Sequence, residues 1–251
     1  MNYSFKKLTR LKKVAIGTVI MLGVITLFSE LNGSSPRTAL IRTSQRARLV
    51  FAKLPTADIF LPVKFDKQDH ALSCEVATLK MALAYKGIQV SEAELIRKLG
   101  VDPTVKRSEN GQLVWGNPQK AFVGNIDGRM PATGYGVYWE PIERVGSDYR
   151  PTRSLQGASV ATIAQELQLG NPVIIWGYLG SGKPFSWKTP DNETIHAVYY
   201  EHTFIVNGLK GSVEKPEGFF VIDPVYGQRY WSLATFTKQW RSFGNSGVVV
   251  Y

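Results

Sequence analysis

Cys74 is the only cysteine of the chain and the first candidate for covalent chemistry. It stands directly before the segment 75–87 (EVATLKMALAYKG), which has apolar residues at helical spacing and ends in glycine. A sulfur at a helix start lies against N–H groups and the positive end of the helix dipole, which lower the pKa of a thiol. A lone cysteine is more often a small buried hydrophobe. At a helix start, however, we predict a nucleophile.

Gln68 lies six residues before the cysteine. An amide just upstream can fold back beside a thiolate, where it and the backbone N–H of Cys74 would form a two-donor oxyanion hole. A glutamine in a loop is usually only solvated, so this signal depends on the other residues of the site.

The candidate base is His202, which begins the apolar run 203–206 (TFIV). The next apolar run, 219–222 (FFVI), ends at Asp223, and the two runs are typical of a hairpin. A carboxylate on the neighbouring strand can fix the imidazole tautomer and leave the other ring nitrogen for the thiol. His196 is an alternative base, and we prefer His202 because Asp223 follows on the next predicted strand.

Five segments together resemble a bacterial family of papain-like cysteine peptidases related to the bacteriocin-leader (double-glycine) peptidases. They are SCEVATLKMALAYKG (73–87), WGNPQKAFVG (115–124), YGVY (135–138), EHTFIVNG (201–208) and VIDP (221–224). The resemblance runs from about Leu61 to the C-terminus. It implies a papain-like fold, a triad of Cys74, His202 and Asp223, and Gln68 as the oxyanion residue.

The residue after the nucleophile departs from the wider family, which often has glycine where this chain has Glu75. A carboxylate there opposes formation of a thiolate through its charge. We therefore expect the Glu75 side chain to point away from the thiol. The sequence also contains no transporter region, so a substrate other than that of an exporter is implied.

The rest of the chain predicts an α+β domain in which helices come first and packed antiparallel strands follow. A capping box at 91–94 opens a short second helix, and further helices are expected at 159–169 and after Ser232. Strands are expected at 173–176, 203–206, 219–222 and 248–251.

The segment 101–155 has little periodicity and reads as a long functional loop. Side chains in it either line a substrate cleft or pack a loop-rich lobe. These candidates are Trp115, Asn117, Tyr135, Tyr138 and Trp139.

Basic residues gather at the N-terminus. The chain has a net charge of +10, of which residues 1–53 carry +9 and the remaining residues +1. The uncharged run 14–28 follows a basic segment, as in a secretory signal, and we favour an uncleaved membrane anchor over a cleaved signal. We therefore expect residues 1–30 to be the signal anchor, 31–55 a basic stalk and 56–251 the peptidase domain. That domain would lie outside the membrane, or be secreted if the signal is cleaved.

The nearly neutral domain argues against nucleic acid as a partner. Three histidines and one cysteine lack the spacing of a zinc site, so neither a metal nor another cofactor is expected. The predicted reaction is hydrolysis of a peptide or protein through a thioester, and cell-wall peptide is one candidate substrate. The alternatives are a wall-peptide amidase, a transglutaminase-like acyltransferase and a non-catalytic binding module with the same fold.

Overall fold

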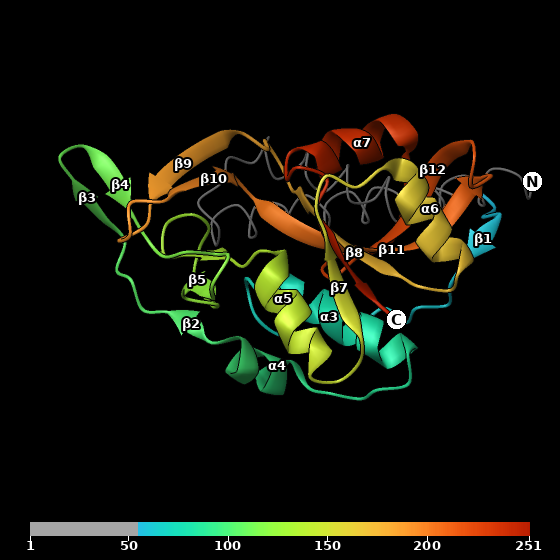
Figure 1. Cartoon of the computed structure of the whole chain (residues 1–251), viewed down its shortest axis with the longest axis horizontal. Helices are drawn as coiled ribbons and strands as arrows, with labels where there is room; N and C mark the ends of the chain where they lie inside the picture. Colours follow the sequence, from blue (N-terminus) through green and yellow to red (C-terminus); the bar gives the residue numbers. More distant parts are fainter. Residues whose placement is uncertain (1–54) are drawn as a thin grey trace, which may run out of the picture. The chain divides into compact units, whose positions relative to one another are not determined.

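A seven-stranded antiparallel sheet is the largest element of the computed structural model, which describes residues 55–251 (Figure 1). Six strands follow the order β13-β12-β11-β8-β14-β7, and the short β1 pairs with β11. Their bounds are β1 Ile59–Phe60, β7 Thr152–Leu155, β8 Val173–Tyr178, β11 Glu201–Gly211, β12 Pro216–Asp223, β13 Gly227–Ser232 and β14 Gly247–Val250.

The central strands are the apolar runs that the sequence predicts. Ile205 of β11 pairs with Ile174 of β8 on one side and with Ile222 of β12 on the other. All three side chains are buried. β-Branched residues suit such a sheet because both of its faces are covered. The predicted strands and the 203–206/219–222 hairpin are therefore confirmed.

Five helices lie among the described residues, and four of them match the sequence-based expectation. Ser91 caps the second of these helices, since its hydroxyl accepts a hydrogen bond from the N–H of Glu94 at 3.2 Å. The helices are α3 Cys74–Tyr85, α4 Glu92–Leu99, α5 Trp139–Ser147, α6 Val160–Gln168 and α7 Leu233–Arg241.

The segment 101–155 is not the long loop that the sequence suggests. It contains helix α5 and six strands of two to four residues, too short to show a hydrophobic period. Two small sheets are built from it, β2-β5-β6 and, with two later strands, β10-β9-β4-β3. The new strands are β2 Val101–Asp102, β3 Arg107–Glu109, β4 Gln112–Val114, β5 Phe122–Gly124, β6 Gly134–Gly136, β9 Pro184–Lys188 and β10 Thr194–Val198.

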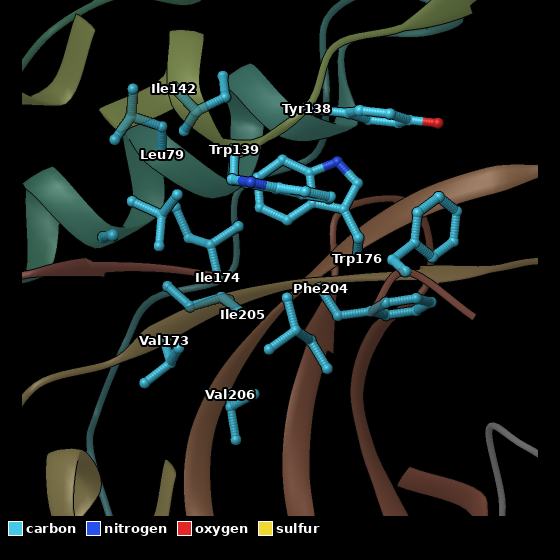
Figure 2. Close-up of a cluster of buried hydrophobic side chains, with 14 of the residues drawn as sticks. Leu79, Tyr138, Trp139, Ile142, Val173, Ile174, Trp176, Phe204, Ile205 and Val206 are labelled. Atoms are coloured by element: carbon cyan, nitrogen blue, oxygen red, sulfur yellow. The ribbon is translucent and has the colours of Figure 1, made fainter. Parts of the chain in front are cut away.

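Helices α3 and α5 cover one face of the large sheet and α7 covers the other (Figure 1). On the first face, Leu79 of α3 and Trp139 of α5 lie over Ile174 and Trp176 of β8 (Figure 2). On the second face, Phe236 of α7 packs on β12. Helix α3 also contacts β11, where the hydroxyl groups of Thr78 and Thr203 lie 3.2 Å apart.

The predicted membrane anchor at 14–28 and basic stalk lie outside the described residues. Within residues 55–251, no helix has the length and apolar character needed to cross a membrane.

Candidate active site

A cavity of about 150 Å³ lies between the start of α3 and the starts of β11 and the β12–β13 turn. Three of the predicted catalytic residues line it: Gln68, Cys74 and His202. The other lining residues are Ala71, Leu72, Met130, Tyr135, Leu179, Tyr200, Glu201 and Val225.

Cys74 is the first residue of α3, as predicted, and is buried with 4% of its surface exposed. Its thiol donates a hydrogen bond to Oε2 of Glu75 at 3.2 Å. The expectation that Glu75 points away from the thiol is therefore wrong. Its carboxylate turns inward because the buried N–H of Val137 needs an acceptor, and it donates a hydrogen bond to Oε1 of Glu75 at 2.7 Å.

These surroundings act against a thiolate in the resting structure. Burial raises the pKa of Cys74 well above its usual value, and the charges of Glu75 and Glu201 add to the effect. Contacts with the backbone and hydroxyl of Thr203 lower it only in part. The sequence-based expectation of a depressed thiol pKa assumed that Glu75 points away and did not include Glu201, and both carboxylates lie near the thiol.

His202 and Asp223 lie side by side on the neighbouring strands β11 and β12. Nε2 of the imidazole is 3.0 Å from Oδ1 of the carboxylate, and both side chains are buried. The imidazole therefore has Nδ1 left for another partner. Among the described residues, no hydrogen bond joins His202 to the thiol of Cys74.

Asp223 is held in place from several sides. Its Oδ1 also accepts hydrogen bonds from the N–H groups of Val225 at 2.8 Å and Tyr226 at 3.2 Å. Its Oδ2 lies 3.3 Å from the guanidinium of Arg229. Burial acts to raise the pKa of Asp223, but the hydrogen bond and charge of His202 and the charge of Arg229 outweigh it and lower that pKa. An ionised carboxylate can thus stabilise a positively charged imidazole.

Gln68 borders the cavity, but its amide group is already engaged. Nε2 donates to the carbonyl oxygens of His70 at 2.7 Å and Ala71 at 3.1 Å. The backbone N–H of Cys74 lies in the first turn of α3, where N–H groups have no partner within the helix. The N–H of Cys74 is therefore available to bind an oxyanion, whereas the amide of Gln68 would first have to give up one of its hydrogen bonds.

Only one of the five aromatic and polar residues predicted for a substrate cleft, Tyr135, lines this cavity. Tyr138 and Trp139 line a second cavity of about 360 Å³ together with His196.

Trp115 and Asn117 pack inside the lobe formed by 101–155 and the β9–β10 hairpin. Trp115 lies 5.5 Å from the ring of Trp187, and Nδ2 of Asn117 donates to Glu193 at 2.6 Å. These contacts tie the lobe together.

Glu201 is the site residue that the sequence analysis missed. It precedes His202, lines the cavity and is 4% exposed. Burial raises the pKa of Glu201 well above its usual value, and the nearby charge of Glu75 raises it further. The sequence shows only that an acidic residue precedes the candidate base. It does not show that this residue is buried, which is what places it in the site.

The sequence of residues 60–248 matches the peptidase C39-like family. The chain belongs to that family. A predicted C39-like peptidase from Bacillus anthracis has a similar solved structure, with 25% identity, a TM-score of 0.64 and coverage of 78% of this chain and 98% of that one.

Two further relatives match over most of the chain. The uncharacterised protein YvpB of Bacillus subtilis strain 168 is 29% identical over 199 residues, which are 77% of this chain and 74% of YvpB. The peptidase domain of Streptococcus ComA, a bifunctional ABC transporter, is more distant, with 15% identity, a TM-score of 0.46 and coverage of 75% and 98%. Family and fold together support a cysteine peptidase.

Proposed function

We propose that the chain is an extracytoplasmic cysteine peptidase or amide hydrolase that works through Cys74, His202 and Asp223. The observation that supports this most strongly is that Cys74 and His202 line one cavity while His202 lies 3.0 Å from Asp223. A nucleophile, a base and a group that orients the base are the parts that acyl transfer requires.

The resting thiol has to change partner before it can react. It donates to Glu75, so its sulfur must turn about the Cα–Cβ bond toward Nδ1 of His202. His202 then takes the thiol proton, and the pair of charges is stabilised by the ionised Asp223. Substrate would stabilise this pair of charges only through contacts that replace the water it displaces, because burial alone disfavours the thiolate.

The proposed reaction has two halves. The sulfur of Cys74 adds to the amide carbonyl carbon, and the N–H of Cys74 with the amide of Gln68 binds the oxyanion. The imidazolium of His202 gives its proton to the leaving amine as the C–N bond breaks, which leaves a thioester. Water then attacks the thioester carbonyl while His202 takes a proton from the water. The C–S bond breaks, the carboxylic acid leaves, and His202 returns the proton to the sulfur of Cys74.

The test is hydrolysis by the full-length chain of a peptide library and of cell-wall peptide fragments. We expect cleavage of at least one substrate, and we expect Cys74→Ala and His202→Ala each to lower kcat/KM by about 10³-fold or more.

His196→Ala is the matched control, because it removes an exposed imidazole that belongs to the other cavity. It should retain kcat/KM within about threefold. Equal losses in His196→Ala and His202→Ala, or full activity in Cys74→Ala, would sink the assignment. Cleavage confined to lactyl or D-amino-acid amides would define the peptidase as a wall-peptide amidase.

A further inference from the structure

Three groups that bind metals meet beside the cavity: the thiol of Cys74 and the carboxylates of Glu75 and Glu201. One ligand atom from each lies within 4.8 Å of the other two, and the sulfur lies 3.2 Å from Oε2 of Glu75. All three residues are buried. Two carboxylates and a thiol are therefore gathered out of contact with bulk solvent, at the edge of the cavity.

Glu201 has no partner for its charge. Neither of its carboxylate oxygens has a hydrogen-bond partner, and both are inaccessible to solvent. Within residues 55–251, no lysine, arginine or histidine forms an ion pair with Glu201 or Glu75. A buried carboxylate without compensation is costly, and a protonated one would still need an acceptor for its O–H. An incoming cation would satisfy both oxygens.

The backbone of β6 holds the two carboxylates close together. A Cβ placed on Gly136 would come within 2.4 Å of Oε1 of Glu75 and 2.7 Å of Oε2 of Glu201. Glycine at this position lets both side chains lie against the strand. The N–H of Val137 then anchors Glu75 at 2.7 Å. The cluster is thus built by the backbone as well as by the side chains.

We propose that Cys74, Glu75 and Glu201 form a site for a thiophilic divalent cation, with Zn²⁺ as the best fit. Zinc binds sulfur at about 2.3 Å and carboxylate oxygen at about 2.0–2.2 Å, so tetrahedral ligands stand roughly 3.3–3.7 Å apart. The three ligand atoms lie within 4.8 Å of one another, so side-chain shifts of about 1 Å would bring them to these distances, with the sulfur and Oε2 of Glu75 moving slightly apart from 3.2 Å. Water from the cavity supplies the fourth ligand, because the cavity borders both Cys74 and Glu201. Calcium and magnesium fit poorly, since they prefer six or more oxygen ligands.

Binding of the cation has a defined consequence for the thiol. The S–H bond breaks, and its proton leaves to solvent together with any proton that the two carboxyl groups carry. The thiolate and both carboxylates then bond to the metal. The sulfur is then held on the Glu75 side of the cavity and cannot turn toward His202. This inhibitory consequence rests on the proposed function, whereas metal binding does not. Zinc would act as a reversible inhibitor that protects the thiol.

The test uses Co²⁺ and Zn²⁺ with the full-length reduced chain. Titration with Co²⁺ should produce a thiolate-to-cobalt charge-transfer absorption band at one equivalent, and Zn²⁺ should abolish that band by displacement. Glu201→Gln should weaken the Kd for Zn²⁺ by at least about tenfold, and Cys74→Ser should abolish the band. An excess of Ca²⁺ or Mg²⁺ should leave the band unchanged.

Glu166→Gln is the matched control because Glu166 is also a buried acid but pairs with Arg153, away from the cavity. Circular dichroism of each variant shows that it is folded. The absence of a cobalt–thiolate band in the folded wild-type chain would overturn the proposal, as would equal Kd values in the two glutamine variants. Zinc that displaces cobalt and abolishes the band but leaves hydrolysis intact would overturn the inhibitory consequence alone. A chain that shows the cobalt band but hydrolyses no substrate would count against the proposed function only.

Discussion

At the scale of residues, the environment of Cys74 combines features that oppose each other. The start of α3 favours a thiolate, whereas burial and two carboxylates favour the neutral thiol. The balance leaves a resting thiol that donates to Glu75. Activation therefore requires a second arrangement in which His202 is the partner. The thiolate form of Cys74 is therefore expected to be scarcely populated in the absence of substrate.

The carboxylate of Glu75 gives a pH prediction. Burial raises the pKa of Glu75 from 4.5 to about 7, although hydrogen bonds from its own backbone, Val137 and Cys74 oppose the rise. The folded state therefore holds this proton more tightly than the unfolded state does. The proton's stabilising effect is complete below the unfolded pKa and is lost as pH rises to about 7.

We expect the free energy of unfolding of the wild-type chain to fall on the order of 2 kcal/mol between pH 5 and 7.5 because of this group. Glu75→Gln should make the slope shallower by about that amount, while Glu166→Gln should keep the wild-type slope. The slope that remains in Glu75→Gln includes the contribution of Glu201, whose pKa burial also raises. Urea unfolding at a series of pH values measures the slope, and identical slopes in wild type and Glu75→Gln would show that the carboxylate is ionised throughout.

The sequence predicted Cys74, His202 and Asp223 from residue type and order, because each lies at the edge of a strongly patterned element. It could not predict that Glu75 faces inward, since the acceptor need of the N–H of Val137 arises only when β6 packs on α3. Glu201 was missed for a related reason. Glu201 precedes the candidate base His202, and the local sequence pattern does not indicate whether an acidic residue is buried.

At the scale of elements, hydrophobic periodicity predicted the long helices and strands but not the short ones. Helix α3 and strands β8, β11 and β12 carry apolar runs that the core of the sheet requires. Helix α5 was missed because its sequence, WEPIERVGS, begins in a segment rich in glycine and aromatic residues and contains Pro141. Proline is tolerated in a first turn, where its missing N–H costs nothing. The two- and three-residue strands depend on tertiary contacts that no local pattern records.

The elements also explain how the site is held. Asp223 ends β12, and its Oδ1 accepts hydrogen bonds from two N–H groups of the following turn, so these contacts hold the carboxylate independently of His202. His202 lies in β11, which is paired on both sides. The base and its orienting acid thus sit on rigid strands, whereas Gln68 lies in an irregular segment. The oxyanion contact is therefore the part of the site that most needs substrate to form.

At the scale of the whole molecule, the N-terminal segment and the peptidase domain differ in net charge. Residues 1–53 carry +9 of the net charge of +10, and an uncharged run lies at 14–28. We propose that this segment anchors the chain in the membrane with the peptidase domain outside. The cations before the run favour a cytoplasmic N-terminus, although Arg37, Arg42, Arg46 and Arg48 follow it.

Protease treatment of intact cells tests this arrangement. A tag at the C-terminus should be removed by external protease, and the chain should sediment with membranes. A variant that lacks residues 14–28 should stay in the cytoplasm and be protected. A protected tag on the full-length chain would contradict the outside location.

The most direct test of the central claim is to trap the acyl group on the enzyme. The full-length chain is mixed with an activated ester of a cleavable peptide, quenched in acid within the first turnover and digested for mass spectrometry. We predict an adduct of the acyl mass on Cys74, formed at least about 10²-fold more slowly in His202→Ala and at the wild-type rate in His196→Ala. Turnover of the ester without any adduct on Cys74, and at an equal rate in Cys74→Ala, would contradict the account.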